Sequence, residues 1–115
     1  MYVGRNFFFT SIADGVIIST ASGCSNYSSS AGGMVMHPQI KGYMITPINS
    51  VKSWIKPLVV PHYLELSFRV NAKNRTEKVD ITFDGIKRVT IGKEHVISMI
   101  FSKKYLQRFI FLLLY

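Results

Sequence analysis

The sequence predicts a mainly β fold, an antiparallel β-sandwich-like domain with one short helix. Three observations carry this prediction. Residues 63–70 alternate between apolar and polar side chains, as a half-buried strand does. A second alternating run over residues 79–83 leads into Asp84-Gly85, a dipeptide that favours a tight hairpin because both central residues of its turn need positive φ. Finally, many short strands with at most one or two helices are typical of β-sandwiches and related layered structures.

Other short runs of apolar or β-branched residues predict further strands. The strand that begins at Gly42 is expected to end at Pro47, since proline cannot donate to a sheet ladder. The C-terminal run of residues 109–115 is apolar, but it is far shorter than the roughly 20 residues that span a bilayer, so we expect a core or interface element there. The remaining strands are predicted at residues 7–9, 15–19, 42–46 and 95–101.

A segment rich in Ser and Gly, STASGCSNYSSSAGG, occupies residues 19–33. Residues 25–31 within it are long enough for a short helix, with Ser25 as the N-cap and Gly32-Gly33 as the stop. A strand that runs into small residues and then a helix presents unpaired backbone N–H groups, which attract anions. The segment matches neither the P-loop nor the G-x-G-x-x-G pattern. A structural turn and a ligand-binding loop are therefore equally good interpretations from the residues alone.

Composition and charge indicate a core-forming domain with a basic surface. The 115 residues are 48% hydrophobic and 17% charged, which fits one globular domain, and the net charge of +8 favours polyanionic partners. The positive charges are dispersed, however, and no arginine-rich run or nucleic-acid motif accompanies them. Solvated strand faces are the better interpretation of most of them, so nucleic acid is not an expected partner.

The sequence offers little for metal or nucleophilic chemistry. Cys24 is the single cysteine, so no intramolecular disulfide is possible, and a reducing compartment fits. No signal peptide is present, and we expect a cytoplasmic protein without a membrane partner. The three histidines are scattered, with no carboxylate or cysteine at ligand spacing, and no serine lies in a G-x-S-x-G elbow. No metal-binding or catalytic residue is predicted.

Several motifs, taken in order, resemble those of a known family. The C-terminal domain of NAD kinases carries a motif close to DGxIxSTPTGSTAYxxxAGGxxxHP, followed by a TPI segment and a PxVxP segment. This chain has DGVIISTASGCSNYSSSAGG from Asp14, then His37-Pro38, TPI at 46–48, PLVVP at 57–61 and FDG at 83–85. The resemblance covers about residues 12–101, and several ordered motifs are far more specific than one glycine-rich loop.

The resemblance implies an enzyme that transfers the γ-phosphoryl group of ATP to the 2′-hydroxyl of the adenosine ribose of NAD, giving NADP. It also implies ATP and Mg²⁺ as requirements, a homo-oligomer with contacts to NAD across a subunit interface, and a β-rich C-terminal domain that supplies much of the NAD site. The residues that fall on the family's NAD-contacting positions are Asp14, Ser22, Ser25, Asn26, Tyr27 and Ser30.

The residue types suit those implied roles. Serine hydroxyls can bind a ribose or the polar edge of adenine, and Tyr27 can stack on a base. A carboxylate at Asp14 can accept a hydrogen bond from a ribose hydroxyl or an amine, although a turn residue is the simpler interpretation of Asp14 taken alone. At three positions the family's Pro, Ser and Ala are replaced by Ala21, Cys24 and Asn26. The last places a bulkier polar group beside the implied ligand.

The family's GGDGT motif, which carries its catalytic aspartate, and its Asn-Glu pair are both absent from these 115 residues. We therefore interpret residues 1–115 as a single partial domain that holds the NAD-binding half and lacks activity alone, since phosphoryl transfer needs a metal and a positioning residue. Two alternatives stay open. One is a non-catalytic NAD(P)-binding or partner-assembly module, and the other is a basic nucleic-acid-binding β domain.

Overall fold

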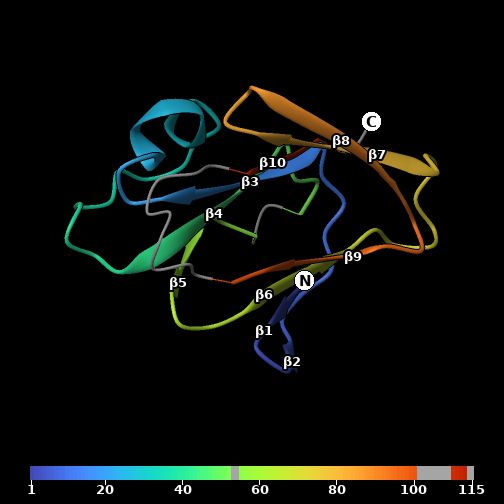
Figure 1. Ribbon diagram of the computed structural model, residues 1–115, viewed down its shortest axis with the longest axis horizontal. Coiled ribbons are helices and arrows are strands. Elements are labelled where there is room, and N and C mark those ends of the chain that lie inside the picture. The colour runs from blue at the N-terminus through green and yellow to red at the C-terminus, as the bar shows by residue number, and fades with distance from the viewer. Residues whose placement is uncertain (53–54, 101–109, 114–115) are drawn as a thin grey trace.

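The computed structural model describes residues 1–52, 55–100 and 110–113. Its strands form two antiparallel sheets stacked face to face (Figure 1). The four-stranded sheet has the order β2-β1-β6-β9, and the six-stranded sheet has the order β5-β4-β3-β10-β7-β8. The predicted class, a mainly β, antiparallel sandwich with one short helical segment, is confirmed.

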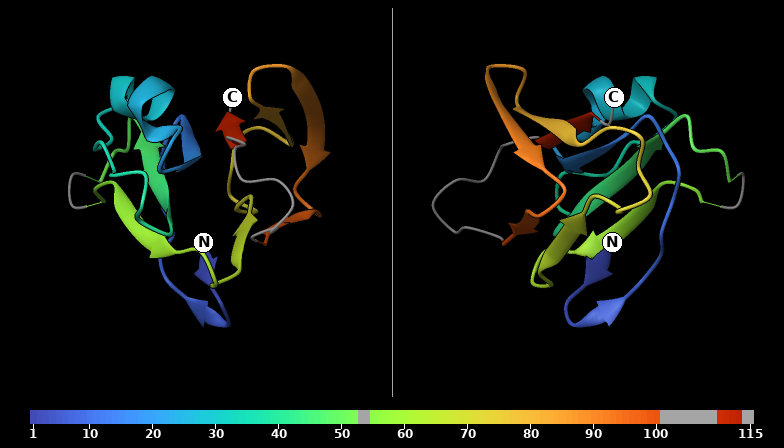
Figure 2. Two further views of the ribbon diagram at one scale, coloured as in Figure 1. Left: turned by 60° about the vertical axis from the view of Figure 1, so that its left-hand side comes forward. Right: turned by 90° about the vertical axis from the view of Figure 1, so that its right-hand side faces the viewer.

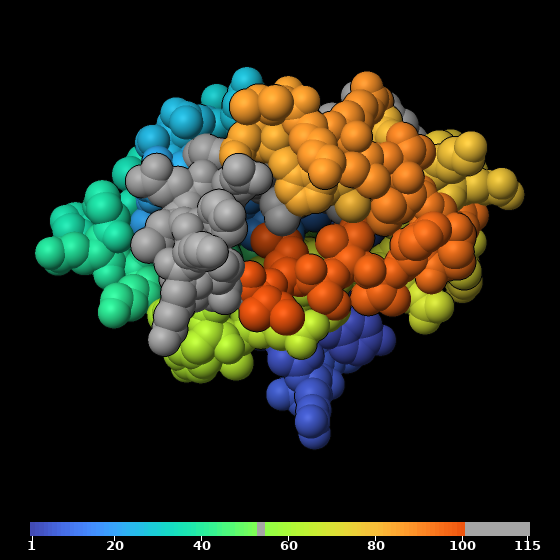
Figure 3. Space-filling model, in the orientation of Figure 1, coloured from blue at the N-terminus to red at the C-terminus, as the bar shows by residue number. Residues whose placement is uncertain are grey.

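Strands from both halves of the chain contribute to each sheet (Figure 2). The four-stranded sheet contains β1 (Tyr2–Val3), β2 (Asn6–Phe7), β6 (Leu66–Arg69) and β9 (Val96–Met99). The six-stranded sheet contains β3 (Gly15–Thr20), β4 (Gly42–Ile48), β5 (Leu58–Pro61), β7 (Lys78–Phe83), β8 (Lys87–Gly92) and β10 (Ile110–Leu113). The β1–β2 hairpin projects from one end of the molecule (Figure 3).

The hydrophobic core lies between the sheets. Ile18 and Ile45 of the six-stranded sheet pack with Leu66 and Phe68 of the four-stranded sheet, and all four are at most 7% exposed. Burial of Tyr43 in this core raises the pKa of its phenol, because desolvation disfavours the charged form. The alternation that the sequence predicts for β6 is therefore present, with Leu66 and Phe68 buried in the core.

The Asp84-Gly85 prediction is also confirmed. Phe83 pairs with Lys87 across the β7–β8 hairpin, and the N–H of Ile86 donates to the carbonyl of Phe83 at 3.0 Å. Asp84 and Gly85 have φ of 51° and 70°, so both central residues of the turn are left-handed, as the dipeptide predicts.

The prediction that Pro47 ends its strand is wrong. β4 continues to Ile48, and Pro47 pairs with Val16 of β3. The pairing of β4 with β5 stops at Ile45, so among the described residues only β3 pairs with β4 at Pro47. A missing N–H is tolerated there, because proline is excluded only where a strand needs its donor.

Other predicted strands differ in their bounds. The run at 7–9 contributes only Phe7, the strand predicted over 63–70 begins at Leu66, and the one predicted over 95–101 covers Val96–Met99, with residue 101 outside the described residues. The C-terminal run supplies β10, which lies between β3 and β7. The strand covers Ile110–Leu113, and the rest of the predicted run lies outside the described residues.

Candidate functional site

The Ser/Gly-rich segment forms a short irregular helix against the six-stranded sheet. This element, η1 (Cys24–Ser28), is a π-helical turn that continues helically through Ser30. Its N-cap is Gly23 without a side-chain hydrogen bond, so the prediction that Ser25 caps the helix is wrong. Asn26 has non-helical dihedrals (φ −93°, ψ −115°), and the following N–H of Ser29 bonds back to the carbonyls of both Asn26 and Cys24.

The predicted stop at Gly32-Gly33 is confirmed by the backbone hydrogen bonds at the end of η1. The N–H groups of Gly32 and Gly33 donate to the carbonyls of Ser29 and Ser28 at 3.0 and 2.7 Å. Gly32 has φ of 87°, a left-handed conformation that glycine adopts without steric cost. The chain therefore leaves the helical turn at once and returns toward β4.

Cys24 attaches the start of η1 to the core. Its side chain is fully buried with Met36 and Met44. The sulfur accepts a hydrogen bond from the Met36 N–H at 3.0 Å and donates one to the carbonyl of Ala21 at 3.1 Å. The cysteine that replaces the family's serine thus faces the sheet rather than a ligand, which makes it a packing residue.

Ser28, four residues later, attaches the end of η1 to β4. Residues four apart lie on the same side of a helical turn, so Ser28 is buried on the face that Cys24 occupies. Its hydroxyl lies 2.7 Å from the hydroxyl of Thr46, which is also fully buried. Gly33 packs directly on this pair, and a Cβ there would lie 2.7 Å from the Thr46 oxygen.

With Cys24 and Ser28 buried in this way, the other side chains of residues 24–30 are exposed. Tyr27 is 61% exposed. Five of the six residues predicted to contact NAD are brought together here, all exposed: Ser22, Ser25, Asn26, Tyr27 and Ser30. The sequence analysis did not predict the buried Ser28–Thr46 pair that holds this turn on the sheet. The only signal for it in the sequence is that both side chains are small and polar.

Local hydrogen bonds orient two of these exposed hydroxyls. The Ser22 oxygen lies 3.2 Å from the hydroxyl of Thr20, the last residue of β3. The Ser30 hydroxyl donates to the carbonyl of Asn26 at 3.4 Å, which leaves its oxygen lone pairs able to accept from a ligand amine or hydroxyl. The surface can therefore offer oriented acceptors beside the aromatic ring of Tyr27.

The sixth residue, Asp14, is not part of this group. It precedes Gly15 at the start of β3, whereas Ser22 follows the end of the same strand. Since a strand rises about 3.3 Å per residue, the two ends are separated by roughly 20 Å. Asp14 is exposed, and its Oδ2 accepts a hydrogen bond from the Asn49 side-chain amide at 2.9 Å.

Elsewhere in the described residues, we looked for metal ligands, pockets and membrane-spanning helices. No group of three His, Cys, Asp or Glu side chains within residues 1–52, 55–100 and 110–113 is placed to hold a metal ion. A pocket at the β7–β8 turn is lined by Phe83, Asp84, Ile86 and Lys87, none of which belongs to the predicted site. Nor is any helix in the part described long and apolar enough to cross a membrane.

Comparison with known proteins identifies the relatives of this domain. The family model described as the ATP-NAD kinase C-terminal domain matches residues 1–111. Among curated proteins, the NAD kinase of Thermoplasma volcanium is 35% identical over 104 residues, which are 90% of this chain and 38% of that protein. The NAD kinase of Nitratidesulfovibrio vulgaris is 44% identical over 73 residues, which are 64% of this chain and 25% of that protein. The chain thus spans well under half of these relatives.

A solved structure shows the same fold. The yeast NADH kinase complexed with NADH aligns with 97% of this chain and 28% of its own, with a TM-score of 0.60 and 20% sequence identity. The alignment supports the arrangement of the two sheets over nearly the whole length of the chain.

Proposed function

This chain belongs to the family of ATP-NAD kinase C-terminal domains, and on that premise we propose that it binds the NAD substrate of a kinase that makes NADP. The observation that carries the proposal is the orientation of η1. Buried Cys24 and Ser28 fix one side of the turn to the sheet, and the five predicted contact residues share the opposite, exposed side. Relatives named NAD kinase, and one solved relative complexed with NADH, support a dinucleotide as the ligand.

Each exposed residue has a role that its chemistry suits. The Tyr27 ring stacks on the adenine, an interaction that depends on the π-face of the base. The hydroxyls of Ser22, Ser25 and Ser30 bind the ribose and the polar edge of the base. The amide of Asn26, in place of a methyl group, adds a donor and an acceptor at the rim. Together these residues hold the adenosine half, whose ribose carries the 2′-hydroxyl to be phosphorylated.

The 115-residue chain alone binds without catalysis in this proposal. ATP supplies the phosphoryl group and Mg²⁺ neutralises its charge in such transfers, and the described residues contain no group of three metal-ligating side chains. We place the metal and the catalytic aspartate in parts of the kinase that the relatives have beyond this domain, since this chain spans 38% of one of them. ATP-dependent formation of NADP by the purified chain would contradict this.

The position of Asp14 supports an oligomer with a shared site. Asp14 lies roughly 20 Å from Ser22 along β3, so it contacts the NAD held by a second copy rather than by its own η1. The side chains of Ile12 and Val51 flank this end of the strand and are 67% and 74% exposed, which suits contact with another chain.

Mixing two variants that each bind NAD weakly tests this arrangement. Asp14→Asn and Tyr27→Ala should each bind NAD weakly, but a mixture forms hetero-oligomers in which one site has both intact residues. Tighter NAD binding by the mixture than by either variant alone is the expected result. If the mixture binds NAD no more tightly than the two variants do separately, both residues act within one chain.

A matched pair of serine variants tests the η1 surface itself. Ser25→Ala removes a hydroxyl that we place on the ligand, whereas Ser29→Ala removes an exposed hydroxyl from the same turn that lies outside the predicted set. A lost hydrogen bond is worth about 1 kcal/mol, so Ser25→Ala should raise the Kd for NAD roughly fivefold. Ser29→Ala should leave it unchanged, and equal effects of the two would remove Ser25 from the site.

A further inference from the structure

The Asp14 carboxylate has a partner that no motif of the sequence indicates. Asp14 stands immediately before β3 and Asn49 immediately after β4, the strand that pairs with it. The Asn49 Nδ2 donates a hydrogen bond to the Asp14 Oδ2 at 2.9 Å. Two residues 35 positions apart are thus joined at an exposed end of the six-stranded sheet.

The backbone around this pair is held by an extension of the β3–β4 ladder. The Asp14 N–H donates to the carbonyl of Ile48 at 2.9 Å, and the Val51 N–H donates to the carbonyl of Ile12 at 3.0 Å. The hydroxyls of Ser11 and Ser50 lie 2.9 Å apart across the same two segments. The chain segments on both sides of the pair are therefore fixed, although neither segment belongs to a strand.

Asn49 itself has a backbone conformation that restricts its identity. Its φ is 48°, in the left-handed region that asparagine and glycine enter more readily than other residues. This conformation turns the chain at the end of β4 and leaves the side-chain amide beside the carboxylate. An asparagine at this position satisfies the backbone and supplies a donor, whereas a glycine would satisfy the backbone alone.

We propose that Asn49 is a positioning residue that holds the Asp14 carboxylate in one orientation for a hydroxyl or amine donor of the dinucleotide. The amide occupies Oδ2, and Oδ1 has no hydrogen-bond partner among the residues that the structure describes. One oxygen is thus held by the protein while the other stays available to the ligand. A side chain that is already fixed before binding loses less conformational entropy when the ligand binds. The affinity is therefore higher without any additional contact to the ligand.

This inference rests on the proposed function, and a double-mutant cycle separates the two. Asn49→Gly keeps the left-handed backbone and removes the side chain that carries the amide, and Asp14→Ala removes the group that it holds. Isothermal titration of NAD into the full chain should show a Kd about threefold to tenfold higher for Asn49→Gly than for the unaltered chain. In the Asp14→Ala background the same substitution should have no effect, since a positioning residue acts only through its partner.

The orientation of the Asp14 side chain can also be measured without ligand. A purely structural role of Asn49 would not change it. Three-bond couplings of the Asp14 side chain in NMR spectra should show one dominant χ1 rotamer in the unaltered chain and averaged rotamers in Asn49→Gly, with equal thermal midpoints for the two proteins. Averaged couplings in both proteins, or an equal loss of affinity with and without Asp14, would overturn the positioning role while leaving NAD binding intact. Absence of NAD binding by the unaltered chain would overturn the proposed function and, with it, this inference.

Discussion

The hydroxyl oxygens of Ser28 and Thr46 lie 2.7 Å apart, and both side chains are fully buried. This pair joins η1, which carries the exposed candidate residues, to β4 in the six-stranded sheet. Because each hydroxyl satisfies the other away from water, the pair fixes the height and rotation of the helical turn. The candidate site therefore depends on two residues that do not themselves reach its surface.

Removing both hydroxyls of this pair should destabilise the domain by less than the sum of the two single removals. Thr46→Val is nearly isosteric and leaves the Ser28 hydroxyl buried without its partner, which we expect to lower the free energy of unfolding by about 1–3 kcal/mol. Ser28→Ala with Thr46→Val together should cost clearly less than the sum of the two single changes. Urea denaturation of the four proteins measures the coupling, and strict additivity would show that the hydroxyls do not interact.

The two glycines at the end of η1 should respond differently to alanine. At Gly33 a Cβ would lie 2.6 Å from the Ser28 carbonyl oxygen and 2.7 Å from the Thr46 hydroxyl, so Gly33→Ala should lower the free energy of unfolding by roughly 1–3 kcal/mol through overpacking. Gly32 has open space around it but a φ of 87°, so Gly32→Ala should cost only the left-handed strain, about 1 kcal/mol. Thermal denaturation of both variants checks the order, and Gly32→Asn should recover most of the smaller loss.

Ser19 offers the opposite case to Ser28. Its side chain is 1% exposed, and its hydroxyl has no hydrogen-bond partner within the described residues. A buried hydroxyl without a partner opposes folding, so Ser19→Ala should leave the free energy of unfolding unchanged or raise it by up to about 1 kcal/mol. Ser28→Ala, equally buried but hydrogen-bonded, is the matched control and should lower it. A large loss of stability in Ser19→Ala would mean that its hydroxyl has a partner after all.

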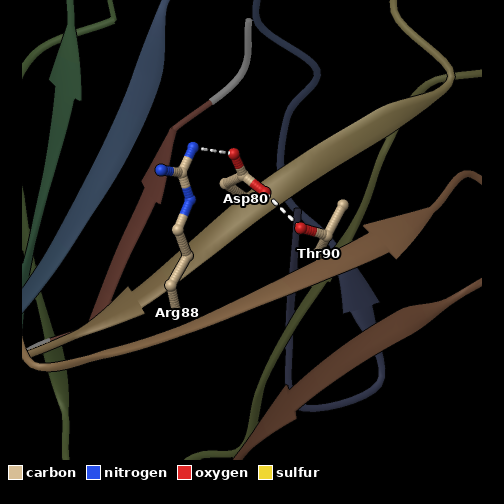
Figure 4. Close-up of polar contacts among 3 residues, drawn as sticks. All are labelled: Asp80, Arg88 and Thr90. Carbon is tan, nitrogen blue, oxygen red and sulfur yellow. Dashed lines mark hydrogen bonds and ion pairs between the residues drawn. The ribbon is translucent and has the colours of Figure 1, made fainter.

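Asp80 on the β7–β8 hairpin should make stability depend on pH in the acid range. Its carboxylate accepts hydrogen bonds from the Arg88 guanidinium and, at 2.6 Å, from the Thr90 hydroxyl (Figure 4). These bonds, that of Arg88 first, hold the pKa of Asp80 below its ordinary value. A depressed folded-state pKa stabilises the fold above the unfolded value of about 4, and this contribution disappears as the pH falls through the folded-state pKa.

Asp80→Asn tests that contribution. The variant should unfold at lower urea concentration than the unaltered chain at pH 6, and the difference should shrink as the pH is lowered toward 3. Arg88→Met should remove much of the same pH-dependent difference, because the guanidinium is the main cause of the shift. A difference between Asp80→Asn and the unaltered chain that stays constant from pH 6 to pH 3 would contradict the assignment.

The elements that the sequence predicted well are those whose signal is local. Alternation placed Leu66 and Phe68 in the core, and Asp84-Gly85 specified its own turn through two positive φ angles. Pro47 was misjudged because its tolerance depends on where the neighbouring strand β5 ends, which is a property of the sheet and not of the residue. The insertion of β10 between β3 and β7 is likewise a long-range pairing that no local pattern specifies.

The candidate site shows the same division. The resemblance to NAD kinases selected six residues, and the structure places five of them on the exposed side of one irregular turn. The inward position of Cys24 and the distance of Asp14 along β3 could not be predicted, since both depend on how the segment docks on the sheet. Asn49 was missed because its partner lies 35 residues away in the sequence.

Titration of NAD into the chain and into two tyrosine variants tests the central claim most directly, that the exposed side of η1 is the dinucleotide-binding surface. Tyr27 is 61% exposed on η1, and Tyr63, 75% exposed in the β5–β6 connection, is the matched control. Stacking of a base on an aromatic ring is worth about 1–3 kcal/mol, so Tyr27→Ala should raise the Kd for NAD roughly 5- to 150-fold. We expect this loss together with an unchanged Kd for Tyr63→Ala. No NAD binding by the unaltered chain, or the same Kd for all three proteins, would contradict the claim.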